Sequence, residues 1–115
     1  MSDAEKLPNP DTAWVEEQKV RRYLLDLDNP KGRAKAEYFM RRGFTLGAWE
    51  IMRDALVQQG VSNPVVKTTD TPYGKRYVVE CSCPTSDGSN PCIRSVWEVV
   101  PTDKRPRLIT AHAFK

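Results

Sequence analysis

Hydrophobic and polar positions alternate along the second half of the chain, from Asn63 to Lys115. The alternation has a period of two and includes many β-branched residues, which predicts β-strands over 65–69, 75–83, 92–100 and 107–114. Proline, glycine and aspartate mark the connections, and none of these connections is long enough to hold a helix. Neighbouring strands are therefore expected to pair antiparallel, in the order in which they occur along the chain.

The first half of the chain changes to the period of a helix. Apolar residues recur three and four positions apart over residues 16–27, 31–42 and 45–59, and Gly43 and Gly60 favour helix ends after the second and third segments. The fold class is accordingly α+β, with two to three N-terminal helices packed on a four-stranded antiparallel meander sheet. The residues expected to pack the helices against one sheet face are Tyr23, Leu24, Phe39, Trp49, Met52 and Leu56.

Chain length and composition are those of one globular domain. The 115 residues suit a single α+β domain over 13–115, preceded by a flexible lead-in over 1–12. Residues 13–15 are expected to add a short strand or to fill the core. No apolar run approaches the roughly 18 residues of a membrane helix, and residues 1–6 lack the apolar core of a signal peptide, so we expect a cytoplasmic protein with no membrane partner.

Three cysteines form the first candidate for chemistry. A hairpin that turns at Asp87-Gly88 places Cys83 opposite Cys92, with Cys81 on the same sheet face. A zinc site needs four ligands, and His112, the only histidine, falls on the other face in this register. We therefore expect three reduced, metal-free thiols in a cytosolic preparation, with a Cys83–Cys92 disulfide as the alternative in an oxidising compartment.

The second candidate is a polar face of the predicted sheet. The simplest register of the last hairpin places His112 opposite Ser95, and Glu80 joins them on the same face. Such a face can perform general acid–base chemistry, or it can be an ordinary solvated surface. Arg94 lies on the opposite face in this register, and a slip of one residue would exchange the two faces.

The third candidate is the excess of basic residues in the helical half. A groove lined by Lys19 and Lys35, opposite Arg94 on the sheet, would suit the phosphate backbone of a nucleic acid. The overall net charge of +3 is compatible with nucleic-acid binding without requiring it. The sequence has no glycine-rich phosphate loop, no G-x-S-x-G elbow and no H-E-x-x-H motif, so we expect neither a cofactor nor a metal ion.

Several short motifs, spread over about residues 7–114, occur together and in a fixed order. They are Leu7-Pro8-Asn9, Lys19 followed by Tyr23-Leu24-Leu25, Pro30-x-Gly32-x-x-Lys35-Ala36-x-x-Phe39-x-x-x-Gly43-Phe44, Thr71-Pro72-Tyr73-Gly74-x-x-Tyr77-Val78-Val79-Glu80, Arg94-Ser95-Val96-Trp97 and Pro106-Arg107-Leu108-Ile109-Thr110-Ala111. In these motifs the chain resembles a bacterial domain family of unknown function seen in polymorphic-toxin and phage-related proteins. The layout of helices followed by a sheet also resembles the barnase–EndoU–colicin–RelE ribonuclease toxins, which is an analogy of fold.

The resemblance implies functional positions residue by residue. Lys19 and Lys35 match the lysines of the first and second helix motifs, and Arg94 and Thr110 match polar positions in the last two strands. These four residues are therefore expected to belong to any site that the family shares.

This chain departs from the family pattern in two places. Asn29 stands where relatives often have histidine before the proline, and His112 stands where they often have tyrosine. A nuclease that uses a histidine on the helical side would lack it here, unless His112 substitutes for it.

Two hypotheses about function follow. The first is a metal-independent endoribonuclease of toxin type that acts on RNA. The second is a non-catalytic interaction domain, of immunity type or a phage accessory protein; the partners to expect are therefore RNA or a small immunity-type protein. Under the first hypothesis the catalytic residues are Lys35, Arg94, Thr110 and His112, and the substrate-binding residues are Lys19, Glu80 and Ser95.

Overall fold

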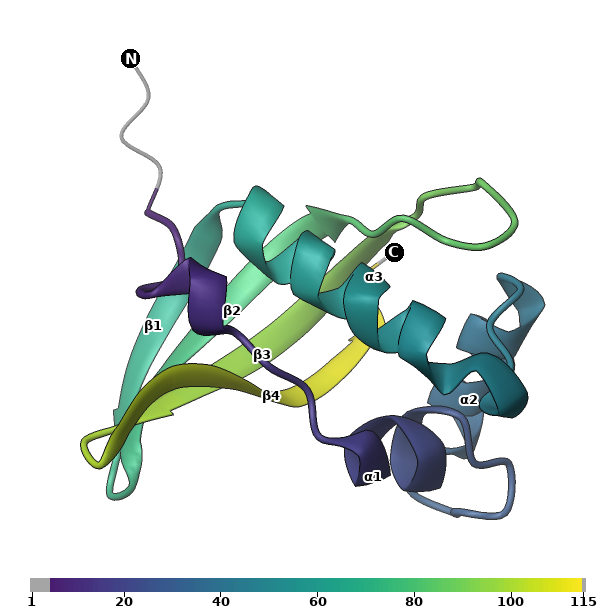
Figure 1. Ribbon diagram of the computed structural model, residues 1–115, viewed down its shortest axis with the longest axis horizontal. Helices are drawn as coiled ribbons and strands as arrows, with labels where there is room; N and C mark the ends of the chain where they lie inside the picture. The colour runs from purple at the N-terminus through teal and green to yellow at the C-terminus, as the bar shows by residue number, and fades with distance from the viewer. Residues whose placement is uncertain (1–4, 115) are drawn as a thin grey trace.

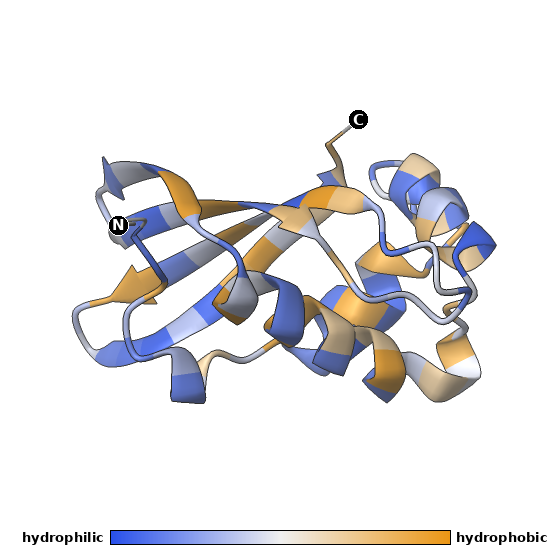
Figure 2. Cartoon of the chain, turned by 90° about the horizontal axis from the view of Figure 1, so that it is seen from above, coloured by the Kyte–Doolittle hydropathy of each residue, from blue (hydrophilic) through white to orange (hydrophobic). Residues whose placement is uncertain are grey.

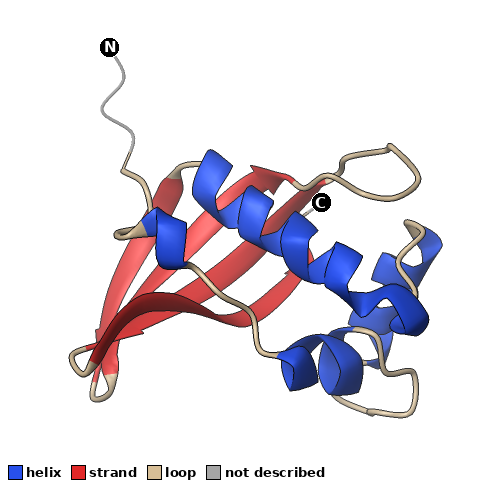
Figure 3. Ribbon diagram, in the orientation of Figure 1, coloured by secondary structure: helices blue, strands red, loops and turns tan. Residues whose placement is uncertain are grey.

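The computed structural model of the chain describes residues 5–114 and shows an α+β fold. Helices come first and a four-stranded antiparallel sheet follows, with strand order β1-β2-β3-β4, which confirms the predicted fold class and meander (Figures 1 and 3). The elements in chain order are η1 (Pro10–Thr12), α1 (Glu17–Lys19), η2 (Val20–Leu24), α2 (Arg33–Arg41), η3 (Leu46–Ala48), α3 (Trp49–Ser62), β1 (Val65–Thr71), β2 (Gly74–Ser82), β3 (Cys92–Val100) and β4 (Asp103–Ala113).

Helix α3 lies across one face of the sheet (Figure 1). It follows the short turn η3, which Thr45 caps by accepting a hydrogen bond from the Ala48 amide at 3.3 Å. The expected stop at Gly60 is wrong, because α3 continues to Ser62. Gly60 serves close packing instead, since a Cβ at this position would lie 2.5 Å from the Trp97 ring.

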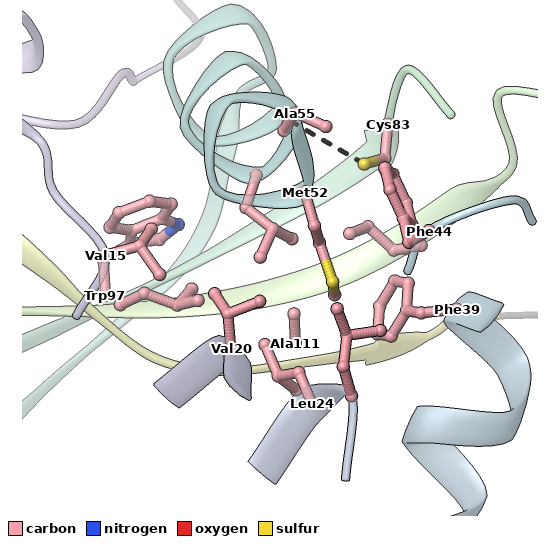
Figure 4. Packing of buried hydrophobic residues seen from close by; sticks show 14 of the residues in the cluster. Val15, Val20, Leu24, Phe39, Phe44, Met52, Ala55, Cys83, Trp97 and Ala111 are labelled. Atoms are coloured by element: carbon pink, nitrogen blue, oxygen red, sulfur yellow. Dashed lines mark hydrogen bonds between the residues drawn. The ribbon is translucent and has the colours of Figure 1, made fainter. Parts of the chain in front are cut away.

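The core forms between α3, the inner sheet face and the first helical segments. Figure 4 shows Val20, Leu24, Phe39, Met52 and Ala111 converging from four elements, and each of them is fully buried. Hydrophobic and hydrophilic residues alternate along the strands, as Figure 2 shows, so only one face of the sheet supplies apolar side chains to this core. Leu24, Phe39, Met52 and Leu56 were expected there and are buried, whereas Tyr23 and Trp49 are only partly buried.

The first two helices are shorter than expected. The segment predicted over 16–27 consists of α1 and the single π-helical turn η2, which ends at Leu24. The second helix begins at Arg33 rather than at Lys31. Gly43 follows it with a φ of +97°, the left-handed conformation expected at this helix end.

The N-terminal segment packs against the domain wherever the structure describes it. Leu7 lies in the core, and the Glu5 carbonyl accepts a hydrogen bond from the Val65 amide at 2.7 Å. Trp14 forms an isolated parallel bridge with Arg107 of β4, which covers part of that edge strand. Residues 5–12 thus make contacts with the domain, while residues 1–4 lie outside the described residues, and the flexible lead-in over 1–12 stays a prediction.

The registers expected for the last two hairpins are wrong by one residue. Glu80 pairs with Arg94 across β2 and β3, and Arg94 pairs with His112 across β3 and β4. Ser95, expected opposite His112, instead pairs with Ala111. The side chains of Glu80, Arg94 and His112 therefore share the face that points away from α3, while Ser95 points toward α3.

A buried hydrogen-bond network explains why Ser95 points inward. The Gln59 side chain of α3 accepts a hydrogen bond from the Ser95 hydroxyl at 2.5 Å and donates to the carbonyl oxygens of Cys81 and Ile93, each at 3.2 Å. The Trp97 indole donates to Ser95 Oγ at 2.8 Å. Gln59, Ser95 and Trp97 are all fully buried, so these bonds satisfy polar groups that water cannot reach.

The cysteines differ from expectation in the same hairpin. Cys81 and Cys92 form a disulfide, so the expectation of three reduced thiols and the alternative Cys83–Cys92 pair are both wrong. The observed register pairs Cys92 with Ser82, which brings it beside Cys81. Cys83 is a buried free thiol near the Ala55 carbonyl (Figure 4), and burial raises the pKa of this thiol to about 12, which makes it unreactive.

The Gln59 network generates a prediction about stability. Gln59→Ala should lower the free energy of unfolding by about 2–4 kcal/mol, because it leaves a cavity and removes the acceptor of the buried Ser95 hydroxyl and a donor to two carbonyls. The neighbouring Gln58 is exposed, so Gln58→Ala should cost less than about 0.5 kcal/mol. Urea unfolding of both variants checks this, and equal losses would show that the network does not stabilise the fold.

Candidate functional site

The candidate site lies where η2 and α2 meet the edge strand β4. At its centre is the Tyr23 hydroxyl, which accepts a hydrogen bond from Lys35 Nζ at 2.5 Å. The Lys35 ammonium lies 4.9 Å from the centre of the Tyr23 ring, and the Lys19 ammonium lies 5.4 Å from it. Two cations therefore surround one phenol, an arrangement that favours a negative charge on its oxygen.

Local backbone geometry places Tyr23 in this position. The Leu25 amide donates to the Val20 carbonyl at 2.8 Å, five residues back, so the chain makes one π-helical turn. Such turns are rare in proteins and often occur at functional sites. Val20, Leu24 and Leu25 all face the core, while the Tyr23 side chain between them is only partly buried.

Gly32 allows the second helix to approach Tyr23 closely. A Cβ at this position would lie 2.5 Å from the Tyr23 carbonyl oxygen and 3.0 Å from its ring, so any larger residue would push the two segments apart. Helix α2 begins directly after Gly32, and Lys35 lies in its first turn. The glycine therefore sets the distance at which Lys35 reaches the phenol.

Thr110 of β4 lies beside Tyr23. Its Oγ1 is buried and makes no regular hydrogen bond within residues 5–114, yet it is near enough to the phenol to favour the phenolate. The hydrogen bond from Lys35 is the main cause that lowers the pKa of Tyr23 below the usual value for tyrosine; Thr110 and the positive charge of Lys19 act in the same direction. Partial burial opposes them without cancelling the effect.

Arg94 and His112 continue the site along the same sheet face. Arg94 donates to the Glu80 carboxylate through Nε at 2.7 Å and through Nη2 at 2.6 Å, and its guanidinium lies 4.6 Å from the centre of the Phe114 ring. His112 is the cross-strand partner of Arg94, and its Nδ1 lies 3.0 Å from the Ala113 carbonyl oxygen. Because a carbonyl can only accept, Nδ1 carries the proton and Nε2 is left available.

The structure brings most of the residues expected from the sequence onto one surface. Thr110 and His112 are two residues apart on one face of β4, which separates their Cα atoms by about 7 Å. Lys35 reaches this surface through Tyr23, and Arg94 faces His112. These residues line a continuous strip, from Lys19 and Lys35 on the helices to Arg94 on β3.

Two residues of the expected substrate-binding set have different surroundings. Ser95 is fully buried against Gln59 on the other face, so its placement in the site is wrong, and the reason is the shifted register. Glu80 lies on the expected face, where its carboxylate accepts hydrogen bonds from Nε and Nη2 of Arg94. Its carboxylate therefore orients the guanidinium rather than facing open solvent.

Sequence reasoning assigned Tyr23 to the core and missed it as a site residue. Its spacing from Lys19, four positions along one helical segment, was a usable signal, because residues at this spacing meet on one side of a helix. Nothing in the sequence indicated the π-turn. Phe114, which stacks under Arg94, carried no recognisable signal at all.

The described part of the chain contains no cluster of side chains suited to bind a metal ion. No three side chains of His, Cys, Asp or Glu are grouped as metal ligands within residues 5–114. Among the same residues, no helix has the length and apolar character needed to cross a bilayer. The strip is instead lined by Lys19, Lys35 and Arg94, which are suited to an anionic ligand.

The lowered pKa of Tyr23 generates a second prediction. In an ultraviolet titration, one of the four tyrosines should ionise at lower pH than the others, and Tyr23→Phe should remove this component. Lys35→Met should move it to higher pH, because the phenolate loses its hydrogen-bond donor and its nearest positive charge. Lys67→Met on exposed β1 removes the same charge elsewhere and should leave the titration unchanged; an early-ionising tyrosine that survives Tyr23→Phe would contradict the assignment.

Comparison with known proteins places the chain in a family and among solved folds. Its structure is similar to a chain of the contact-dependent growth inhibition toxin–immunity protein complex from Klebsiella pneumoniae 342, with a TM-score of 0.67 and 18% identity over 90% of this chain and 94% of that chain. At this identity the likeness shows a shared fold alone. No curated protein sequence matches the chain. The sequence profile of the domain of unknown function DUF6883 matches residues 6–115, and the chain therefore belongs to the DUF6883 family.

Proposed function

We propose that this domain is a metal-independent endoribonuclease of toxin type, which acts in the cytoplasm of a target cell. The observation that carries the proposal is the strip along β4, where Lys35 bonds to Tyr23 beside Thr110 and Arg94 pairs with His112. Cations together with a histidine can supply the positive charge and the proton transfer that phosphodiester cleavage requires. The fold shared with a chain of a toxin–immunity protein complex supports the toxin assignment.

RNA carries its own nucleophile, so the protein need not supply one. The ribose 2′-hydroxyl attacks the neighbouring phosphorus, and the bond from phosphorus to the 5′-oxygen breaks. This reaction requires a proton acceptor for the hydroxyl, a proton donor for the leaving oxygen and positive charge for the pentacoordinate phosphorus. His112 exchanges a proton through Nε2, and Lys35 and Arg94 stabilise the phosphorane.

The remaining residues of the strip position the reacting groups. Glu80 occupies Nε and Nη2 of Arg94, which holds the guanidinium plane and leaves Nη1 to face a phosphate oxygen. Thr110, whose Oγ1 is buried beside the Tyr23 phenol, positions that phenol rather than the substrate. Lys19 binds the RNA backbone beyond the scissile bond, as a charge contact without sequence specificity.

A second candidate function is a non-catalytic interaction domain, of immunity type or a phage accessory protein. The likeness to a chain of a toxin–immunity protein complex favours it as well, because such a complex contains both kinds of protein. In that case the strip would contact an acidic protein surface instead of RNA. A small immunity-type protein is also the partner to expect if the domain is the toxin.

Cleavage of RNA by the purified domain separates the two candidates. We expect wild-type protein to cut bacterial RNA in the presence of a chelator and to leave 2′,3′-cyclic phosphate ends. His112→Ala and Lys35→Ala should each lower the rate by about 10²–10⁴, because each removes a group that acts only in the transition state. Thermal midpoints should change little, since both side chains are partly solvent-exposed.

The matched control is Lys67→Ala, an exposed lysine on β1 at the opposite edge of the sheet. This variant should keep full activity, which would show that the effect of Lys35→Ala is not a general effect of charge. Absence of cleavage by the wild-type domain, together with growth inhibition that persists in His112→Ala cells, would remove the nuclease assignment.

A further inference from the structure

We propose that Tyr23 is the general base of the reaction, and that His112 is the general acid. The inference rests on the proposed endoribonuclease function and assigns the two proton-transfer roles within it. It is carried by the position of the phenol, which lies between Lys35 and Thr110 at one end of the strip, and by His112, which lies two residues beyond Thr110 along β4.

The surroundings of Tyr23 are those of a working base rather than a core tyrosine. Lys35 donates to its oxygen, the Lys19 ammonium lies over its ring, and no carboxylate bonds to it among the described residues. A cation over the ring is found at Tyr38 as well, with Arg42 4.7 Å from the ring centre, so the feature that distinguishes Tyr23 is the hydrogen bond from Lys35 to its oxygen. The cations lower the pKa of Tyr23, so a larger share of the phenol is ionised near neutral pH than in an exposed tyrosine.

The other groups on this face are less suited to accept the proton. Glu80 is engaged by Arg94 through both Nε and Nη2, which ties up the carboxylate as a salt bridge. Lys19 and Lys35 are cations that serve as donors and charges. Of the groups that remain, Tyr23 and His112 carry an oxygen and a ring nitrogen that can exchange a proton, and both lie near Thr110.

Two proton transfers accompany the cleavage of the phosphodiester bond. The Tyr23 phenolate takes the proton from the 2′-hydroxyl while the 2′-oxygen forms a bond to phosphorus. The bond from phosphorus to the 5′-oxygen breaks, and this oxygen takes the proton of His112 Nε2. The products are a 2′,3′-cyclic phosphate and a 5′-hydroxyl, with Tyr23 protonated and His112 neutral; exchange with water restores both groups. Lys35 keeps its proton throughout and compensates the phenolate charge.

Two local features preserve this geometry at the cost of ordinary helix structure. The π-turn over Val20–Leu24 lets the core residues face inward while the phenol reaches β4. Gly32 lets the first turn of α2 approach so closely that Lys35 can bond to the phenol. Both features are explained if the position of the Tyr23 oxygen matters for function.

The experiment is a pH–rate profile of RNA cleavage for the wild type, Tyr23→Phe and Lys35→Met. The wild-type profile should have two limbs, because the reaction needs Tyr23 deprotonated and His112 protonated, and one limb should have the tyrosine midpoint measured by ultraviolet titration. Tyr23→Phe keeps the ring and its packing but should lose about 10²–10⁴ in rate together with this limb. Lys35→Met should shift the limb to higher pH, because the base is then harder to ionise.

Binding and a matched variant separate chemistry from structure. Tyr23→Phe should bind an uncleavable RNA that carries 2′-deoxyribose with the same Kd as the wild type. Tyr73→Phe, at the exposed tip of the β1–β2 hairpin, should leave rate and profile unchanged. If Tyr23→Phe keeps the wild-type cleavage rate and the tyrosine limb of the pH–rate profile while His112→Ala is inactive, Tyr23 is not the base, and the nuclease assignment is unaffected. No cleavage by the wild type would overturn both.

Discussion

The hydrogen bonds between Gln59, Ser95 and Trp97 determine which way the central strand faces. Gln59 projects from α3 into the sheet and is satisfied only when the Ser95 hydroxyl points at it. Trp97, two residues along the same strand, fills the space under Gly60 and donates to that hydroxyl. A shift of β3 by one residue would bury Arg94 in place of Ser95, at a cost of several kcal/mol for an unpaired buried charge.

The orientation of β3 in turn assembles the outer face. Once Ser95 points inward, Arg94 must point outward, where it meets Glu80 on one neighbouring strand and His112 on the other. The same parity brings Thr110 to the outer face of β4, beside the helices. The buried network and the polar strip therefore depend on the same strand register, although none of the network residues Gln59, Ser95 and Trp97 belongs to the strip.

The helical side of the strip depends on a different compromise. The first helical segment buries Val20, Leu24 and Leu25, and its backbone makes a π-turn over Val20–Leu24. Tyr23, within this turn, is left at the edge of β4, next to Lys35. The phenol contacts Lys19 and Lys35 from two helical segments and lies beside Thr110 of the sheet, so it connects the helical half of the fold to the sheet.

The sequence by itself determined the architecture and the family-like residues. Period-two and period-3.6 patterns identify strands and helices from single segments, so the α+β meander and the buried Phe39, Met52 and Leu56 were all predictable. Lys19, Lys35, Arg94 and Thr110 were selected from motifs alone, and their role as a functional site stays a prediction. What these patterns define is which residues share a face, since that depends only on spacing within one element.

Only the tertiary structure decided which face is buried and what opposes it. Register is set by contacts between elements, here Gln59 of α3 with Ser95 of β3, and alternation along a strand is equally compatible with either choice. The Cys81–Cys92 pair and the exclusion of Ser95 follow from that choice. The polar surroundings of Tyr23 could not be predicted for the same reason. Its partners Lys35 and Thr110 are distant in sequence and meet it only when the helices pack against β4.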